Sequence, residues 1–142
     1  MKDKNRSLVK NIFMAVFAAG AMMSCSTMGS TASKVGAAQM NIQNTQWTLA
    51  DNVKGKKPTM VIETGKLNGN GGCNNYFGEV VTDAATGTFT ANNLGSTKMA
   101  CDNMETERSF MNMLSEANNY VVKGNMLELY KGKLLLLKFN KL

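Results

Sequence analysis

The sequence predicts an α+β domain in which a strongly curved, mostly antiparallel sheet or small barrel packs against a single α-helix. Three observations support this fold class. Strand-like segments occupy residues 45–100, one segment at residues 101–119 has a helical period, and three further strand-like segments run to residue 139. Strands that occur in runs on either side of one helix, rather than alternating with helices, are typical of α+β folds.

The first run of strand-like segments is interrupted by turn residues. Residues 45–50 place Trp47 and Leu49 on one face, and residues 58–64 begin with a proline, at the position where a strand tolerates it best. Two Asn-Gly pairs within residues 65–72 predict a break or a hairpin turn. We expect residues 76–81 and 87–91 to form two strands joined by a short loop, and residues 94–100 to form another.

The helix is predicted from apolar spacing. Phe110, Met113, Leu114 and Ala117 fall at positions i, i+3, i+4 and i+7, which places them on one face of a helix. After the helix, residues 120–139 read as three strands with turns at residues 123–125 and 131–132. The run of leucines at 134–137 fits either a strand that is buried on both faces or one that lines a cavity.

The N-terminus predicts export and lipidation. Four basic residues and one acid precede an apolar run at residues 12–23, which is too short to span a bilayer and is typical of a signal peptide. Ser24 and Cys25 follow directly, in an arrangement that resembles a bacterial lipobox. We therefore expect residues 1–24 to be a lipoprotein signal peptide and Cys25 to carry the acyl chains that hold the protein on a membrane. The alternatives are an ordinary signal peptide and an uncleaved anchor.

The remaining chain divides into a tether and one domain. Residues 25–43 are rich in Ser, Gly, Ala and Thr and have no periodicity, so they predict a flexible tether, whereas residues 44–142 have the composition of one small domain. Removal of the signal peptide lowers the formal charge from +6 to +3. The mature chain therefore gives no case for a nucleic-acid partner, and we expect a monomer.

Cys73 and Cys101 are the two remaining cysteines of the mature protein. A pair of cysteines in an exported protein suggests a disulfide, because the compartment is oxidising. The alternative is two buried free thiols that act as small hydrophobic residues.

Three sequence segments together resemble the META domain family, also called the HslJ-like family of bacterial envelope proteins. They are TQWTLA, GNGGCNNYFGEV and STKMACDNMETERSFMNML, and the resemblance extends over residues 44–140. The residues that carry it, besides the two cysteines, are Trp47, Leu49, Gly72, Asn74, Tyr76, Gly78, Thr97, Met99, Ala100, Glu107 and Phe110. The resemblance implies a small α+β domain with no established catalytic activity, and a general association with heat shock and stress response.

The composition argues against catalysis and against a cofactor. The chain has no histidine, which removes the commonest general base and metal ligand. The mature part keeps eight of the twelve methionines, so a Cu(I) site is conceivable, but methionines also fill gaps in small cores and we expect no metal. We expect Asn74 and Glu107 to have structural roles, with Glu107 either accepting hydrogen bonds from the loop at residues 72–74 or pairing near Arg108.

The sequence thus predicts a non-enzymatic lipoprotein of the cell envelope. Ser26 follows the cysteine where an aspartate would retain the protein at the inner membrane, so we expect it on the outer membrane, facing the periplasm. It would be a stress-response or envelope-assembly factor that binds an unidentified protein or lipid. The alternative is a carrier that holds a small apolar ligand in its curved sheet.

Overall fold

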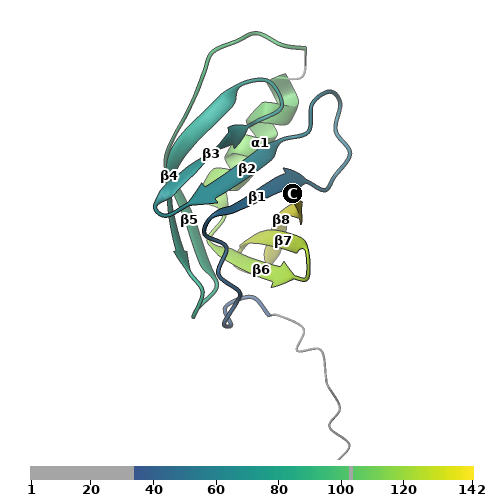
Figure 1. The fold of residues 1–142 in the computed structure, drawn as a ribbon. Coiled ribbons are helices and arrows are strands. Elements are labelled where there is room, and N and C mark those ends of the chain that lie inside the picture. Colours follow the sequence, from purple (N-terminus) through teal and green to yellow (C-terminus); the bar gives the residue numbers. More distant parts are fainter. Residues whose placement is uncertain (1–33, 103) are drawn as a thin grey trace, which may run out of the picture. The chain divides into compact units, whose positions relative to one another are not determined.

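The computed structural model describes residues 34–102 and 104–142, and the predicted signal peptide and Cys25 lie outside these residues. The strands are β1 (Thr45–Leu49), β2 (Thr59–Glu63), β3 (Lys66–Asn70), β4 (Asn75–Asp83), β5 (Thr88–Ser96), β6 (Asn119–Lys123), β7 (Met126–Lys131) and β8 (Leu134–Lys141). One helix, α1 (Met104–Glu116), occurs within the described residues, between β5 and β6 (Figure 1). The expected α+β class is confirmed, in a form dominated by strands.

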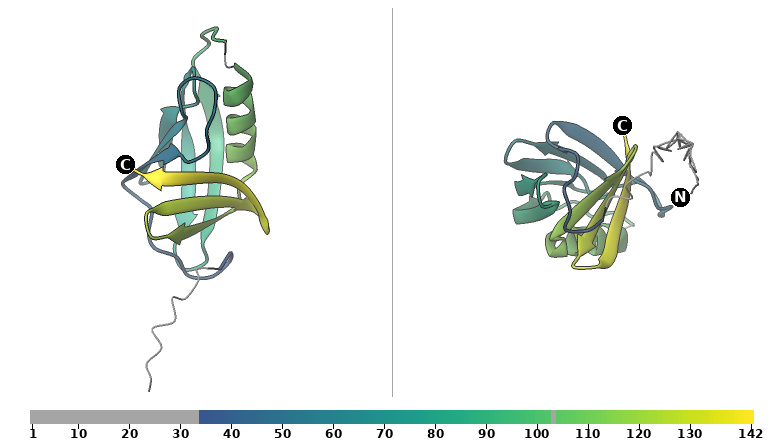
Figure 2. Two further views of the ribbon diagram at one scale, coloured as in Figure 1. Left: turned by 90° about the vertical axis from the view of Figure 1, so that its right-hand side faces the viewer. Right: turned by 90° about the horizontal axis from the view of Figure 1, so that it is seen from below.

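The strands form a closed antiparallel barrel in chain order. Closure comes from β1 and β8, where Trp47 lies opposite Lys141 and Leu49 lies opposite Phe139. The weakest seam is between β5 and β6, which pair only at Thr88 and Asn119. The connection across this seam contains α1, which lies alongside the wall that includes β5 (Figure 2). The helix packs against β5 and β8.

The barrel interior is filled with large side chains. Period-two alternation directs Met60 and Ile62 of β2 inward, and the apolar stripe of α1 adds Phe110 and Leu114. The largest fully buried side chains also include Trp47, Tyr76, Phe89, Tyr120, Leu127 and Phe139. A carrier would need interior space for its ligand, and this packing gives that function no support.

The segment with two Asn-Gly pairs contains strand β3 between two turns. The predicted break or hairpin is therefore present at both ends of the segment, at Gly65 and at residues 71–72, but the first Asn-Gly pair lies within the strand. β3 pairs with β2 from Thr59↔Asn70 to Glu63↔Lys66, and the hairpin turn lies earlier, at residues 64–65. Gly69 is required by close approach, because a Cβ atom there would lie 2.1 Å from the carbonyl oxygen of Thr59. Glycine in this strand thus marks tight contact between backbones rather than a turn.

We expect Gly69→Ala to lower the free energy of unfolding by about 2–3 kcal/mol, because β2 and β3 must separate locally. Urea denaturation followed by the fluorescence of the buried Trp47 measures this change. Gly124→Ala is the control: its φ of 59° is strained for alanine, but nothing lies within 4 Å of the added Cβ, so we expect a loss of about 1 kcal/mol. Equal losses in the two variants would contradict the close-approach explanation.

Two other strand expectations differ from the structure. Residues 87–91 and 94–100 were expected to form separate strands, but β5 runs unbroken from Thr88 to Ser96 and ends before the rest of the second segment. A shift in register between Phe77 and Glu79 of β4, with Asn93 at a φ of 50°, lets the long strand bend without ending.

The leucine run at 134–137 fits neither of the expected environments along its whole length. Leu134 is 63% exposed and Leu135 is 41% exposed, whereas Leu137 is only 2% exposed. The strand β8 therefore begins at the surface and enters the core only from Leu137 onward.

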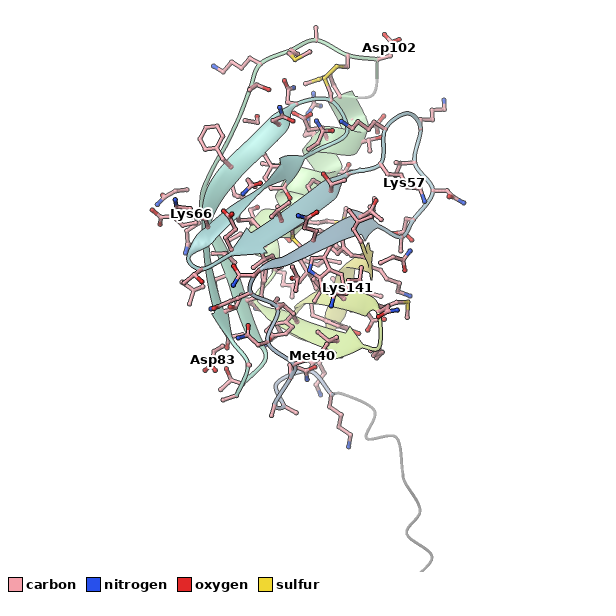
Figure 3. The ribbon with its side chains drawn as sticks, in the orientation of Figure 1. Met40, Lys57, Lys66, Asp83, Asp102 and Lys141 are labelled. Carbon is pink, nitrogen blue, oxygen red and sulfur yellow. A yellow bond between two sulfur atoms is a disulfide. The ribbon has the colours of Figure 1, made fainter. Side chains whose placement is uncertain are left out.

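The sequence analysis predicts that the domain starts at residue 44, but residues before this position also pack against the barrel. Ile42 is 1% exposed within the core. The hydroxyl of Tyr120 donates to the carbonyl oxygen of Met40 (2.9 Å), and the Val122 amide donates to Oε1 of Gln39 (3.1 Å). Met40 is labelled in Figure 3, near the start of the described chain. The packed part of the chain therefore includes residues that composition assigns to the tether.

Candidate functional site

Hydrogen bonds of two asparagines, Asn70 and Asn74, hold the loop between β3 and β4. Asn70 accepts a hydrogen bond from the Gly72 amide through Oδ1 (3.0 Å) and donates through Nδ2 to the Cys73 carbonyl (3.2 Å). The Gly71 amide donates to the Asn74 carbonyl (2.8 Å). The side chain of Asn70 thus takes the place of main-chain partners inside a tight turn.

Asn74 and Glu107 join this loop to the helix. The main-chain amide of Asn74 donates to Oε2 of Glu107 (2.6 Å), and its side-chain Nδ2 donates to Oε1 (3.0 Å). Both residues are buried, with Asn74 1% exposed and Glu107 6% exposed. The two hydrogen bonds offset the free-energy cost of burying this carboxylate, as expected for a structural role.

Asn74 also holds the segment that follows β5. Its Oδ1 accepts hydrogen bonds from the Thr97 hydroxyl (2.8 Å) and the Met99 amide (2.7 Å), and its Nδ2 also donates to the Met99 carbonyl (3.2 Å). One side chain therefore connects three segments that are distant in sequence: the β3–β4 loop, the segment after β5, and α1.

A disulfide connects the same loop to the segment that precedes the helix. Cys73 and Cys101 are bonded, with Cα atoms 6.0 Å apart and a sequence separation of 28. The bond is drawn in yellow near Asp102 in Figure 3. The expected disulfide is therefore present in the structure, and the alternative of two free thiols is not.

Three of the remaining motif residues, Trp47, Tyr76 and Phe110, lie in the core rather than at this loop, whereas Ala100 is exposed. Tyr76 donates its hydroxyl to the Thr59 carbonyl (2.9 Å), and burial raises its pKa, so it stays a neutral donor. The Phe110 ring packs between Tyr76 and Phe139, with ring centroids 5.6 and 6.2 Å away. Trp47 is 1% exposed, far along the chain from the loop.

The sequence analysis named Gly72, Asn74, Thr97, Met99 and Glu107 as motif residues and expected contact only between Glu107 and the loop at residues 72–74. It missed how two neighbours of these residues take part. A Cβ atom on Gly71 would lie 2.8 Å from Cγ of Glu107, so glycine lets the carboxylate reach the loop. The missed acceptor is Asn70, and the signal for both was the second Asn-Gly pair, which lies where β3 ends and the turn begins. Gly78 lies apart from the loop, in β4 opposite Leu67.

The hydrogen bonds of this loop indicate a structural role. Both oxygens of Glu107 accept hydrogen bonds from Asn74, and within the described residues every buried side-chain nitrogen or oxygen has a partner. No group of three Cys, Asp or Glu side chains in residues 34–102 and 104–142 is arranged to hold a metal ion.

A second buried carboxylate, Glu128, lies on the outer side of β7. Burial raises its pKa, but hydrogen bonds from Lys123 and Tyr130 and the charges of Lys123 and Lys138 outweigh this and hold the pKa below its usual value. Lys123 lies 2.8 Å from Oε2, and the Tyr130 hydroxyl donates to the same oxygen (2.6 Å). Burial, together with this hydrogen bond, raises the pKa of Tyr130 to about 12. The cluster fastens β6, β7 and β8 to one another.

A groove lies on the surface between α1, β8 and the segment after β1. We call it the helix groove. It has a volume of about 280 Å³, an acidic rim that includes Asp51 and Glu105, and an apolar floor formed by Leu49, Val53, Phe110, Met113 and Leu137. A larger hollow of about 630 Å³ shares Glu105 and Thr106 with it and is lined by Lys54 and Cys101. The disulfide thus forms part of the wall of the neighbouring hollow.

One family of proteins matches most of this chain. The model of the META domain matches residues 31–141. The chain belongs to the META domain family. That match begins before residue 44, as does the packing of Ile42 and its neighbours in the structure.

Two solved structures share the META fold of this chain. One is an NMR structure of a protein from Burkholderia xenovorans, which is 21% identical, covers 77% of this chain and 93% of its own, and has a TM-score of 0.61. The other is an NMR structure of a protein that is 24% identical, covers 69% of this chain and 89% of its own, and has a TM-score of 0.54. At these identities the likeness concerns the fold alone. No curated protein matches the chain.

The described residues include no helix that has both the length and the apolar character needed to cross a membrane.

Proposed function

We propose that this META domain is a non-enzymatic, lipid-anchored binding module of the bacterial outer membrane, facing the periplasm and serving envelope assembly or the stress response. The observation that supports it is that the motif residues contact other parts of the fold. Asn74, Glu107 and the disulfide are engaged in joining three segments of the fold, which leaves them no vacant group for chemistry. The surface nearby offers a groove with an apolar floor. A rigid scaffold beside an open groove suits partner recognition.

The membrane attachment in this proposal rests on the sequence. Lipidation of Cys25 supplies two or three acyl chains, which together hold a protein on a bilayer far more firmly than one. The tether that follows keeps the domain near the membrane without fixing its orientation. A partner in the proposal is therefore another envelope component that is reached from the membrane surface.

We expect Cys25→Ser to move the protein from the membrane fraction to the soluble fraction and to remove the lipid label, whereas Ser26→Ala leaves both unchanged. Native mass spectrometry of the wild-type protein, purified from its own envelope in detergent, then reports what accompanies it. The proposal predicts a lipid-modified chain with a co-purifying protein. Unchanged fractionation of Cys25→Ser would refute the anchor, and a stoichiometric apolar ligand without a protein partner would favour the carrier.

A further inference from the structure

Positive charge is concentrated in two segments of the domain. Strands β6 to β8 and their turns, residues 119–142, contain five lysines and one acid, and the connection between β1 and β2, residues 50–58, contains three lysines and one acid. Residues 59–118, which lie between these segments in sequence, contain three basic and seven acidic residues. The small net charge of the domain therefore combines a strongly basic part with an acidic part.

The two basic segments lie side by side in the structure. The Ala50 amide donates to the Lys138 carbonyl of β8 (2.8 Å), and Nζ of Lys57 donates to the Ala50 carbonyl (3.5 Å). In the left view of Figure 2, the β1–β2 connection and strands β6 to β8 face the viewer together. We call the lysines of these two segments the basic face.

Glu128, the one acid of residues 119–142, is buried beneath two of these lysines. Its side chain is 5% exposed, whereas those of Lys123 and Lys138 are 44% and 38% exposed, and their Nζ atoms lie 2.8 and 3.8 Å from its oxygens. Tyr130 donates to the same carboxylate and, with a pKa raised to about 12, carries no negative charge at neutral pH. The ammonium groups therefore reach solvent and the carboxylate does not, so this surface is positive.

Acidic residues border the basic face on the side of α1. Lys131 pairs with Glu116 at the end of the helix (3.1 Å). Lys54 lines a hollow together with Asp102 and Glu105. These two lysines therefore mark the edge of the basic face, where their charges are partly offset.

Three exposed lysines of the basic face carry charge that no carboxylate offsets directly. Lys56, Lys133 and Lys141 make no ion pair within the part of the chain that the structure describes. Asp51 is the one exposed acid in the two segments. A net positive charge therefore remains at the surface, and it complements an anionic partner.

Exposed leucines adjoin the lysines at the tip of the β7–β8 hairpin. Leu134 and Leu135, which follow Lys133 directly, are 63% and 41% exposed. A soluble polyanion offers such leucines nothing to contact. A bilayer surface offers anionic headgroups to the lysines and an apolar layer just beneath them to the leucines. This combination favours an anionic lipid surface as the partner.

The chain leaves the domain toward the predicted lipid anchor from the edge of the basic face. The Val122 amide of β6 donates to Oε1 of Gln39 (3.1 Å), and Lys123 is the next residue of that strand. Gln39 is 14 positions after Cys25, so even a fully extended chain keeps the domain within about 50 Å of this cysteine. A linker this short gives a nearby binding surface a high effective concentration, so each weak lysine contact counts.

We propose that the basic face binds an anionic phospholipid surface and so orients the anchored domain with β6 to β8 toward the membrane. The leucines at the tip of the β7–β8 hairpin enter the headgroup boundary beside the lysines. This inference rests on the proposed function, because the lipid on Cys25 brings the domain to the bilayer. The opposite side of the barrel, which carries Lys66 on β3, then faces away from the membrane.

The test uses the lipidated chain in vesicles of phosphatidylcholine, with and without about 30% phosphatidylglycerol. Amine acylation followed by peptide mass spectrometry measures how fast each lysine reacts. We expect phosphatidylglycerol to slow the acylation of Lys138 and Lys141 by at least about threefold. Salt at about 0.5 M should abolish this difference, because it screens the attraction. Lys66 is the internal control and should react equally in both kinds of vesicle.

Variants with matched charge changes locate the contact. Lys56→Glu combined with Lys133→Glu should remove the slowing at Lys138, because it reverses two charges of the basic face that have no ion pair. Lys66→Glu combined with Lys98→Glu changes the net charge equally, outside the basic face, and should keep the slowing. Near-ultraviolet circular dichroism confirms that each variant is folded, so that a lost effect reports on the surface.

The proposal is overturned if Lys138 reacts equally in both kinds of vesicle, if Lys66 slows as much as Lys138, or if the two double variants behave alike. Slowing caused by inorganic phosphate in pure phosphatidylcholine vesicles would show a site for free phosphate and would also overturn it. The mass of the purified chain reports the lipid on Cys25 separately. A lipidated chain without slowing would leave the proposed anchor standing and refute only this membrane contact, whereas a chain without lipid would refute both.

Discussion

Replacing Asn74 with alanine lowers the free energy of unfolding by about 3 kcal/mol. The variant removes the hydrogen bonds that its side chain makes with Glu107, Thr97 and Met99, and it does so at a position that is 1% exposed. Each buried polar group left without a partner costs about 1–3 kcal/mol, and the losses are not fully additive. Urea denaturation at neutral pH measures the change.

The matched control is Asn112→Ala, because Asn112 is an exposed residue of α1. We expect its effect to stay within about 0.5 kcal/mol. If Asn74→Ala were equally mild, the assignment of Asn74 as a structural hub would be wrong. Retained stability together with a lost envelope phenotype at normal abundance would indicate that the loop is itself a functional site.

The second large effect is expected from the disulfide. Reduction of the wild-type protein, or the double variant Cys73→Ser and Cys101→Ser, should lower the free energy of unfolding by about 3–4 kcal/mol, because the bond closes a separation of 28 residues in the unfolded chain. The Asn74–Glu107 contacts join the same segments, so we expect the barrel to remain folded at 25 °C in the reduced state.

Denaturation with and without a reducing agent measures this contribution, and the double variant is the control because a reductant should not affect it. Intact-mass analysis after alkylation of free thiols reports the oxidation state. Two alkylated cysteines at positions 73 and 101 in the unreduced protein would contradict the bond. A denaturation midpoint that does not depend on the reductant would contradict its contribution to stability.

Parts of the candidate site were predictable because they depend on local pattern or on simple chemistry. The spacing of Phe110, Met113 and Leu114 predicted the helix, and the structure places Phe110 and Leu114 in the core. The presence of Cys73 and Cys101 in a chain that the sequence predicts to be exported suggested their bond. A structural role for Glu107 was expected because the chain has no histidine with which it could form a catalytic pair, and the structure shows Glu107 accepting hydrogen bonds from Asn74.

Other parts were misread because local pattern favours two structures. The residues Asn68-Gly69 and Asn70-Gly71 are a strong turn signal, yet Gly69 lies in a strand. Glycine is needed at position 69 because the Thr59 carbonyl of β2 lies too close for a Cβ atom. Residues next to Gly69 in the sequence do not indicate this contact. Likewise, Leu134 to Leu137 look equally apolar, but only the position of their neighbours decides which of them is buried.

The sequence by itself determined the kinds of elements, because strand alternation and helical spacing record which face of each segment avoids water. Only the tertiary structure decided which segments meet. Closure of the barrel joins Leu49 to Phe139, and the hub joins Asn74 to Glu107 across 33 residues. The first residues of β8 have a strand neighbour only in β7, because β1 ends its pairing with β8 at Leu49. Such contacts depend on register and on the positions of distant residues, which no local pattern of amino acids encodes.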